Sequence, residues 1–337
     1  MVYLCGCSLF FISFMDTIQS QKVQVLRGIA IIGVVLIHTT WGGYWQVVFR
    51  PFVNYSVALF LFISGFLTKV TNDNWSSFYS KRVLRVLLPF LLWTLIYTLP
   101  STNLKDYMEH ILFANATPHL YYLFVYIQFV LLTPLLGRLA LSKHRWIGFL
   151  IAPVSIIGYT YVNLVFGVQP NWLISNLWAI SALGWFGFYY LGLLLGNGLM
   201  TINIKWQTLI LLYGLTILLQ IGEGYVWYIF YGMGTCGTQL KLTSLLTSSI
   251  ALFAAYKYIL DSKMSQTPIV LKKIGDFSFG IYLSHELLLM LLSNHTTWYS
   301  EIHFVLNAVI ILTLSFVLVA TVRRLVGERV SRWIGFA

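Results

Sequence analysis

The chain has 337 residues, of which 58% are hydrophobic and only 9% are charged, and its mean hydropathy is +0.80. A soluble domain carries about 25% charged residues, so this composition excludes an ordinary soluble enzyme and indicates an integral membrane protein. The net charge of +11 does not indicate nucleic-acid binding, because the Lys and Arg residues lie in short segments between apolar runs, where they set membrane topology.

Residues 1–20 precede the first long apolar run, and we interpret them as an N-terminal extension of doubtful status, with Met15 as an alternative start. We expect residues 21–337 to form a single multi-pass membrane domain. The cysteines are Cys5, Cys7 and Cys236, and their spacing is that of neither a disulfide framework nor a zinc site. We therefore expect no bound metal.

Ten apolar runs approach the length of about 20 residues that a helix needs to cross a bilayer. They lack the alternation of β-barrel strands, so helices are the structure that satisfies their backbone in lipid. The expected spans lie near residues 26–46, 51–69, 83–99, 119–136, 147–166, 177–197, 205–221, 243–260, 277–293 and 304–322. The sequence predicts an all-α integral membrane protein with about ten transmembrane helices.

The positions of the basic residues predict the orientation. If the N-terminus is cytoplasmic, the outer segments hold only Arg50, Lys105 and Lys241, and the remaining 18 of the 21 Lys and Arg residues lie on the cytoplasmic side. Cytoplasmic loops carry an excess of Lys and Arg, so this bias predicts an even number of spans with both termini in the cytoplasm.

The first expected span contains LRGIAIIGVVLIH, Leu26 to His38. Arg27 and His38 are eleven positions apart, which is about three helical turns, so they share a face and lie ~16 Å apart along the axis. Arg27 is then at the cytoplasmic mouth and His38 in the outer half of the span. An ionisable residue inside a membrane usually lines a cavity, which favours a functional His38. A helix–helix hydrogen bond is its alternative, and Arg27 could equally be an interfacial anchor.

The third expected span begins with SKRVLRVLLPFLLW, Ser80 to Trp93. Arg82 and Arg85 are three positions apart and share a helix face, and Lys81 adds a third positive charge. Arginine suits the recognition of phosphates. Topological anchoring explains the same charges, and on these residues alone we favour it.

Two later stretches carry ionisable residues. His119 lies at the outer end of the span 119–136, where an interfacial histidine is the simpler interpretation. His285 and Glu286, in FGIYLSHELLLM, lie near the middle of the span 277–293. Adjacent helical residues point to different faces, so these two need not touch. A buried acid beside a histidine indicates function, and a polar clasp between helices is the alternative.

The segment 222–242 is expected on the outer side and is rich in Gly, Tyr and Trp. Tyr and Trp favour the membrane interface, so we interpret this segment as part of an aromatic belt. A platform for a sugar ring is the alternative, because the apolar faces of sugars pack on aromatic rings.

Together and in this order, these stretches resemble the acyltransferase-3 family of membrane acyltransferases over roughly residues 20–325. Arg27 and His38 match its signature of Arg, ten residues and His, and Arg82 and Arg85 match its Arg-x-x-Arg motif. LFLFISGFL, which contains Ser64, is similar to its Phe-Phe-x-x-Ser-Gly-Phe segment. Pro89, Trp93 and the HLYYL and GIYLSH stretches also fit, whereas Tyr121 stands where a Trp is frequent.

The resemblance implies a membrane O-acyltransferase that moves acetyl from cytoplasmic acetyl-CoA to a hydroxyl of an exported or lipid-linked cell-surface polysaccharide. It implies catalytic roles for His38 and Arg27, and donor binding by Arg82, Arg85 and Lys81. Further candidate site residues are His285, Glu286, His119 and Ser64. The donor would be a substrate with no bound cofactor, and the glycan acceptor and membrane lipids would be the other partners. A bacterial plasma membrane is the expected location.

The role of His38 stays open between two routes. It could deprotonate the acceptor hydroxyl, or it could hold the acyl group as an acyl-imidazole. A transporter or flippase of glycan or lipid is the main alternative function, because His285 and Glu286 would suit a proton-coupled carrier. No repeat between the two halves of the sequence supports that alternative. A non-catalytic scaffold or sensor would leave the ordered Arg and His positions unexplained.

Overall fold

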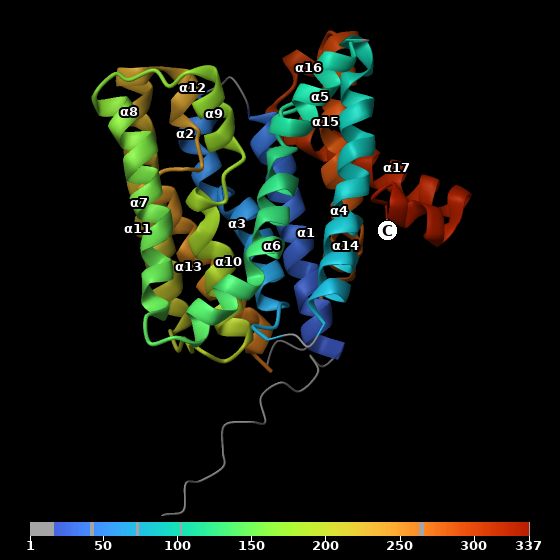
Figure 1. Cartoon of the computed structure of the whole chain (residues 1–337). Helices are drawn as coiled ribbons and strands as arrows, with labels where there is room; N and C mark the ends of the chain where they lie inside the picture. Colours follow the sequence, from blue (N-terminus) through green and yellow to red (C-terminus); the bar gives the residue numbers. More distant parts are fainter. Residues whose placement is uncertain (1–16, 41–43, 72–73, 102, 263–265, 337) are drawn as a thin grey trace, which may run out of the picture.

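The computed structural model of the chain describes residues 17–40, 44–71, 74–101, 103–262 and 266–336, and every regular element in these ranges is helical (Figure 1). Met15, Cys5 and Cys7 lie outside the described residues, as does most of the expected N-terminal extension. The all-α prediction is confirmed for the described part of the chain.

The longer elements are α1 (Thr17–Thr39), α3 (Tyr55–Phe66), α4 (Trp75–Thr98), α5 (Leu104–Phe113), α6 (Tyr121–Leu141), α7 (Gly148–Ile156), α9 (Trp172–Ala179), α10 (Phe186–Gly196), α11 (Trp206–Tyr231), α13 (Leu242–Leu260), α14 (Ile269–Asp276), α15 (Ser278–His295) and α17 (Phe304–Trp333). Single helical turns join them: α2 (Trp45–Val48), η1 (Arg50–Phe52), η2 (Leu99–Ser101), η3 (Arg145–Ile147), η4 (Ile157–Tyr161), α8 (Val162–Val165), η5 (Leu183–Trp185), α12 (Met233–Cys236) and α16 (Trp298–Glu301).

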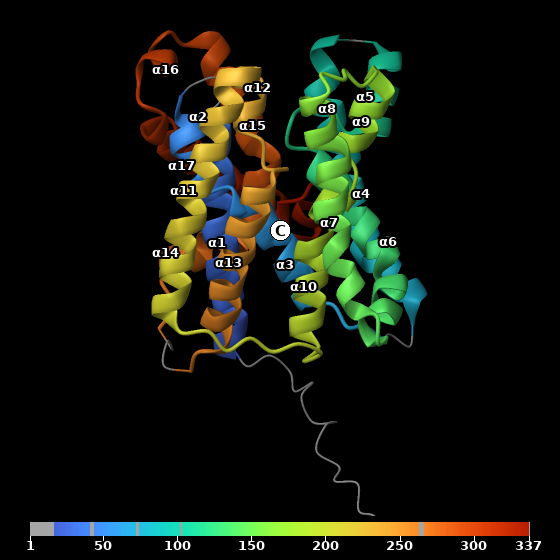
Figure 2. The ribbon, with the colours of Figure 1, turned by 90° about the vertical axis from the view of Figure 1, so that its left-hand side faces the viewer.

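Within the described ranges, eight helical segments are long and apolar enough to cross a membrane. They are Thr17–Thr39, Trp45–Phe66, Tyr121–Leu141, Arg145–Val165, Trp172–Gly196, Trp206–Tyr231, Leu242–Leu260 and Phe304–Trp333. A ninth results if α14 and α15, which bend by 75° at their junction, form one broken span. Figure 2 shows the long helices running side by side between the two ends of the molecule. The chain is a multi-pass membrane protein, and the number of ten spans and the side of each terminus stay predictions.

The remaining expected span, 83–99, lies in α4. Every 18-residue stretch of this 24-residue helix contains Lys81, Arg82 and Arg85, so α4 is too charged to meet the same criterion. Its length of ~36 Å is nevertheless enough to cross a hydrocarbon core about 30 Å thick. Asn74 caps its start by accepting a hydrogen bond from the Ser77 backbone N–H at 2.9 Å.

The segment 222–242, expected as an outer loop, begins as helix. α11 continues to Tyr231 and ends at Gly232, whose φ of 81° favours glycine. The Gly- and aromatic-rich composition therefore did not mark the end of the span, because Tyr, Trp and Gly are all tolerated in membrane helices.

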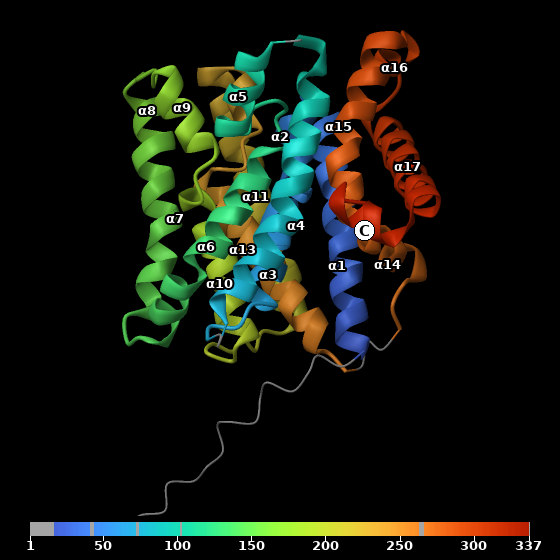
Figure 3. The ribbon, with the colours of Figure 1, turned by 45° about the vertical axis from the view of Figure 1, so that its right-hand side comes forward.

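Glycines allow α1 and α3 to pack in backbone contact with their neighbours. A Cβ atom at Gly65 of α3 would lie 2.1 Å from the Tyr189 carbonyl oxygen of α10, and one at Gly28 of α1 would lie 2.2 Å from the Leu271 carbonyl oxygen of α14. Such close approach of small residues drives helix association in lipid, where apolar side chains gain little from leaving the tails. Figure 3 shows α14 and α15 alongside α1.

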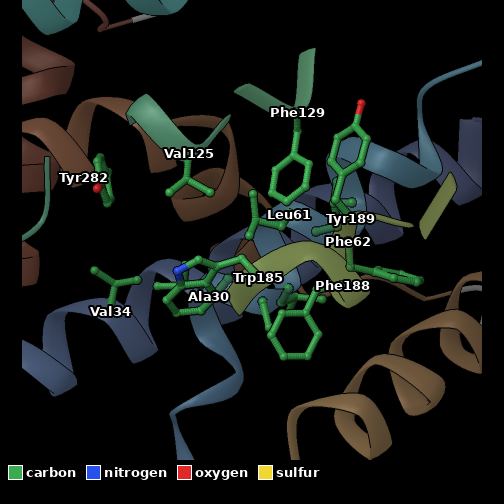
Figure 4. Close-up of a cluster of buried hydrophobic side chains, with 14 of the residues drawn as sticks. Ala30, Val34, Leu61, Phe62, Val125, Phe129, Trp185, Phe188, Tyr189 and Tyr282 are labelled. Atoms are coloured by element: carbon green, nitrogen blue, oxygen red, sulfur yellow. The ribbon is translucent and has the colours of Figure 1, made fainter. Parts of the chain in front are cut away.

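A buried aromatic core continues from this contact between α3 and α10 and packs around α1 and α3 (Figure 4). Phe129 of α6 stacks on Tyr189 of α10, with ring centroids 4.7 Å apart and planes within 6°. The Tyr189 hydroxyl lies 3.0 Å from Thr133 Oγ1, and Leu61 and Phe62 of α3 are fully buried beside it. This packing holds α1, which carries Arg27 and His38, in the interior of the bundle.

The chain turns back at the end of α17. Gly327 interrupts this helix with a φ of 74°, a conformation that favours glycine. Trp93 Nε1 of α4 then donates a hydrogen bond of 3.0 Å to the Ile334 carbonyl oxygen, and the Phe336 ring lies 5.7 Å from the Trp93 ring. The final residues are thus anchored beside α4 and α15.

Candidate functional site

Four ionisable side chains from three parts of the chain meet in one place, which we call the histidine–glutamate cluster: His38, His119, His285 and Glu286. His38 lies near the end of α1, His119 just before α6, and the other two in α15. The ring centroid of His285 lies 5.0 Å from that of His38 and 4.9 Å from that of His119, and the last two are 6.1 Å apart. Separate signals in the sequence therefore form a single site in space.

His38 and Glu286 form the central pair. The distance from His38 Nδ1 to Glu286 Oε2 is 3.1 Å, and the side chains are 15% and 11% exposed. The contact is short enough for an ion pair but lacks hydrogen-bond geometry, and Oε2 has no hydrogen-bond partner among the described residues. An ionised carboxylate only accepts, so in the neutral imidazole this contact favours the proton on Nδ1 and a lone pair on Nε2. A histidine oriented by a carboxylate in this way can take a proton from a hydroxyl at its other nitrogen.

His285 is held as a neighbour of this pair. Its Nδ1 lies 2.7 Å from the Tyr282 carbonyl oxygen, to which it donates, so the neutral imidazole has no proton on Nε2. That Nε2 is 4.0 Å from Glu286 Oε2, too far for a hydrogen bond. His119 Nδ1 lies 3.1 Å from Thr117 Oγ1. Among the described residues, no hydrogen-bond partner occurs for Nε2 of either His119 or His285, and both side chains are buried.

Two tyrosines that the sequence reasoning did not identify fix the walls of the cluster. Tyr97 of α4 donates to the Leu283 carbonyl oxygen at 2.8 Å and accepts from the Leu287 N–H at 3.0 Å, which brackets Glu286 on α15. The Tyr282 hydroxyl donates to the His119 carbonyl oxygen. Tyr282 was within reach of sequence reasoning, because it precedes His285 by three residues and so shares its helix face.

The cluster has the chemistry to hold a cation. His38, His285 and Glu286 each offer one donor atom, and these atoms lie within 4.8 Å of one another. Two histidines and a carboxylate are a donor set found in catalytic zinc sites. The sequence predicted no metal, and the direct His38–Glu286 contact allows a proton-transfer pair without one. A chelation experiment separates the two possibilities.

A cavity of about 370 Å³ lies between α1, α3, α4, α6 and α15, and we call it the arm cavity. The candidate residues Arg27, Ser64, Arg82 and Arg85 all line it. Arg82 Nη1 donates to Thr68 Oγ1 at 2.5 Å and Nη2 to the Leu67 carbonyl oxygen at 3.2 Å, which ties α4 to the end of α3. Lys81 is exposed and does not line the cavity.

The arm cavity leads toward the histidine–glutamate cluster. Tyr282 lines it, and the Tyr282 ring also lies 5.0 Å from the His119 ring and 5.9 Å from the His285 ring. His38 itself is not part of the cavity lining. Tyr282 thus contacts both the cavity, which Arg27 also lines, and the cluster.

Arg50 stabilises the end of α1 next to His38. The topology count placed this residue in an outer loop, but only 4% of its surface is exposed. Its Nη2 donates to the Ile37 carbonyl oxygen at 2.7 Å, Nε to Thr40 Oγ1 at 3.0 Å and Nη1 to the Gly237 carbonyl oxygen at 3.2 Å. A cation at a helix C-terminus is favourable because it meets free carbonyl groups and the negative end of the helix dipole.

Lys241 holds residues 236–237, where the Gly237 carbonyl oxygen also binds Arg50. Its Nζ donates to the Cys236 carbonyl oxygen at 2.8 Å and lies 5.3 Å from the centre of the Trp227 ring. Burial lowers the pKa of Lys241 to about 8. Nearby, Glu223 accepts hydrogen bonds from the Tyr161 and Thr243 hydroxyls. These contacts link α7–α8, α11 and α13 at the end of the bundle that also holds Arg50.

A comparison with protein-family models matches residues 21–324 to the acyltransferase-3 model, which describes an acyltransferase domain. No curated protein and no solved structure matches the chain significantly.

Proposed function

The chain belongs to the acyltransferase-3 family, and from that membership we propose that it is an O-acetyltransferase. The donor is cytoplasmic acetyl-CoA, and the acceptor is a hydroxyl of an exported or lipid-linked cell-surface polysaccharide. The observation that carries the proposal is the contact of 3.1 Å between His38 Nδ1 and Glu286 Oε2.

The reaction needs a base for the acceptor and an acid for the leaving group. His38 Nε2 takes the proton of the acceptor hydroxyl as its oxygen attacks the thioester carbonyl carbon. The C–O bond forms, the C–S bond breaks, and the imidazolium returns the proton to the thiolate of CoA. Glu286 stabilises the imidazolium while the charge exists, which is the role of the carboxylate in a catalytic triad.

The donor reaches this pair through the arm cavity. CoA is polyanionic, and Arg82 and Arg85 present guanidinium groups suited to phosphate oxygens. The pantetheine arm is long and thin, and it must cover the ~16 Å between the levels of Arg27 and His38. Movement of the Tyr282 side chain would admit the thioester to the cluster.

The acceptor approaches from the outer side. His38 lies near the outer end of α1, whose last turn is held by Arg50, and its side chain is partly exposed. An exported glycan is therefore closer to the base than a cytoplasmic one. We assign the protein to the bacterial plasma membrane, where acetyl-CoA and an exported glycan meet across one bilayer.

A comparison of surface-glycan acetylation tests the proposal. Cells that express the wild-type protein should carry O-acetyl groups on their surface polysaccharide, and His38→Ala cells should lose them at equal protein level. His295→Ala, an exposed histidine at the end of α15, is the matched control and should retain acetylation. Unchanged acetylation in the His38→Ala cells would refute the role of His38.

A second measurement separates direct transfer from an acyl-histidine route. In the direct route, purified protein incubated with radiolabelled acetyl-CoA and no acceptor stays unlabelled. If the wild-type protein is covalently labelled and His38→Ala is not, His38 acts as a nucleophile and not as a base. Glycan movement without any label transfer would support a transporter instead.

A further inference from the structure

A second and larger cavity of about 880 Å³ lies beside the cytoplasmic half of α1, against the α14–α15 corner and α17. We call it the basic cavity, because Arg27, Lys273, Arg323 and Arg324 line it with only Asp276 and Glu328 as acidic groups. Binding sites for small molecules measure about 300–1,000 Å³, so both this cavity and the arm cavity have the size of a ligand site.

The groups of the basic cavity suit a phosphorylated nucleotide. Arg323 Nη2 forms an ion pair of 3.0 Å with Glu328, which neutralises one cation and leaves an excess of positive charge. The rings of Phe277 and Phe316, 5.0 Å apart, also line the cavity and offer a purine base a stacking surface. Guanidinium and ammonium groups beside aromatic rings can meet phosphates and a base together.

The wall formed by α17 is built into the fold. Gly327 lines the cavity, and its positive φ turns the chain so that the segment after it folds back. The hydrogen bond from Trp93 to Ile334 and the packing of Phe336 against Trp93 hold that segment in place. The cavity wall at Gly327 and Glu328 therefore begins an anchored segment, and Arg323 and Arg324 lie on the turn of α17 directly before it.

Arg27 lines both cavities. A molecule with an anionic nucleotide end and a slender arm could lie across the two, with Arg27 beside the diphosphate where they join. We propose that acetyl-CoA occupies both cavities: the basic cavity binds its 3′-phosphorylated ADP end, and the arm cavity holds its pantetheine arm. This inference rests on the proposed acetyl-CoA donor. Arg324 and Lys273 contact the 3′-phosphate, Arg27 together with Arg82 and Arg85 of the arm cavity contacts the diphosphate, and Phe277 contacts the adenine.

Donor truncation combined with mutation tests this division. Purified protein in vesicles of neutral phosphatidylcholine is assayed with acetyl-CoA and with acetyl-pantetheine, which lacks the nucleotide. Arg324→Ala should raise the KM for acetyl-CoA about tenfold or more, as the loss of a hydrogen bond to a charged group predicts. It should leave the KM for acetyl-pantetheine and both kcat values unchanged. Arg329→Ala, an exposed arginine beyond Gly327 that does not line the cavity, is the control.

Equal effects of Arg324→Ala on both donors, or no effect on either, would overturn the assignment. An anionic lipid headgroup could use the same cations. In that case the effect of Arg324→Ala would appear with both donors, only after phosphatidylglycerol is added to the vesicles, and the nucleotide assignment would be wrong.

Direct binding keeps the test independent of acetyl transfer. Wild-type protein should bind adenosine 3′,5′-bisphosphate in a titration, and Arg324→Ala and Lys273→Ala should each weaken that binding about tenfold. Binding of equal strength in all three proteins would refute the site even if the protein is an active transferase. Binding that weakens as expected in a protein without transferase activity would instead refute the proposed reaction.

Discussion

Replacing Glu286 by Gln removes the negative charge from the central pair and keeps the size of the side chain. The amide can still meet His38, but it cannot stabilise an imidazolium by its charge, and its NH₂ group allows the wrong imidazole tautomer. At the observed contact of 3.1 Å, this substitution resembles the loss of the carboxylate in a serine-protease triad, where the rate falls about 10⁴-fold. A more exposed pair loses less, so we expect kcat to fall about 10²–10⁴-fold.

Glu286 does not line the arm cavity or the basic cavity. The KM for acetyl-CoA should therefore stay within about twofold of the wild-type value, since an interaction made only in the transition state changes kcat and not donor binding. The assay is the initial rate of acetyl transfer to the glycan acceptor at several acetyl-CoA concentrations. Glu301→Gln, an exposed carboxylate in α16, is the control for the same chemical change. A Glu286→Gln protein with kcat within twofold of the wild type would refute the reasoning.

Three further predictions follow from the cluster and its supports. Arg50→Met should lower kcat by about 10²-fold without changing the KM for acetyl-CoA, because a shift of about 1 Å in the end of α1 misplaces His38. Arg50→Lys should recover part of the rate. An unchanged kcat for Arg50→Met in steady-state kinetics would count against a positioning role. Treatment with EDTA should leave the transfer rate unchanged, and metal analysis of the purified protein should find no stoichiometric metal. If EDTA abolishes activity and zinc restores it, His38, His285 and Glu286 form a metal site and not a proton-transfer pair. Burial lowers the pKa of Lys241 to about 8, below its ordinary value of about 10.4. The folded protein therefore loses this proton before the unfolded chain does, and the cost of the buried charge is relieved as pH rises from about 8 to 10. The Tm of the wild type relative to that of Lys241→Met should rise over that range, and a constant difference in Tm would contradict the prediction.

The membrane class and the Arg27–His38 stripe could be predicted because both depend on local properties. Hydropathy and helical spacing along one segment are enough to place Arg27 and His38 on one face about three turns apart. In the structure α1 is one continuous helix from Thr17 to Thr39, in which Arg27 lines the arm cavity and His38 belongs to the histidine–glutamate cluster.

The partner of His38 could not be predicted from spacing. Glu286 lies at the other end of the chain, and only the packing of α15 against α1 brings the two side chains together. The adjacent positions of His285 and Glu286 did indicate that they point in different directions, and the structure shows the result. Glu286 reaches His38, whereas His285 bonds to its own helix.

The roles of the individual cations also required the tertiary structure. A topology count treats all Lys and Arg residues alike, so Arg50 was counted as a loop charge, although it is buried against the end of α1. Lys81 was grouped with Arg82 and Arg85 by position, but it lies about 100° from Arg82 around the helix and points away from the arm cavity. Which cation meets carbonyl groups and which meets a cavity depends on the neighbouring helices.

The most direct test of the account is the rate of acetyl transfer by purified protein from radiolabelled acetyl-CoA to surface glycan. The account predicts transfer by the wild-type protein and by His295→Ala, and a rate in His38→Ala reduced by at least about 10²-fold, with all three proteins equally folded. A His38→Ala protein that transfers acetyl at the wild-type rate would contradict the assignment of the histidine–glutamate cluster as the catalytic centre.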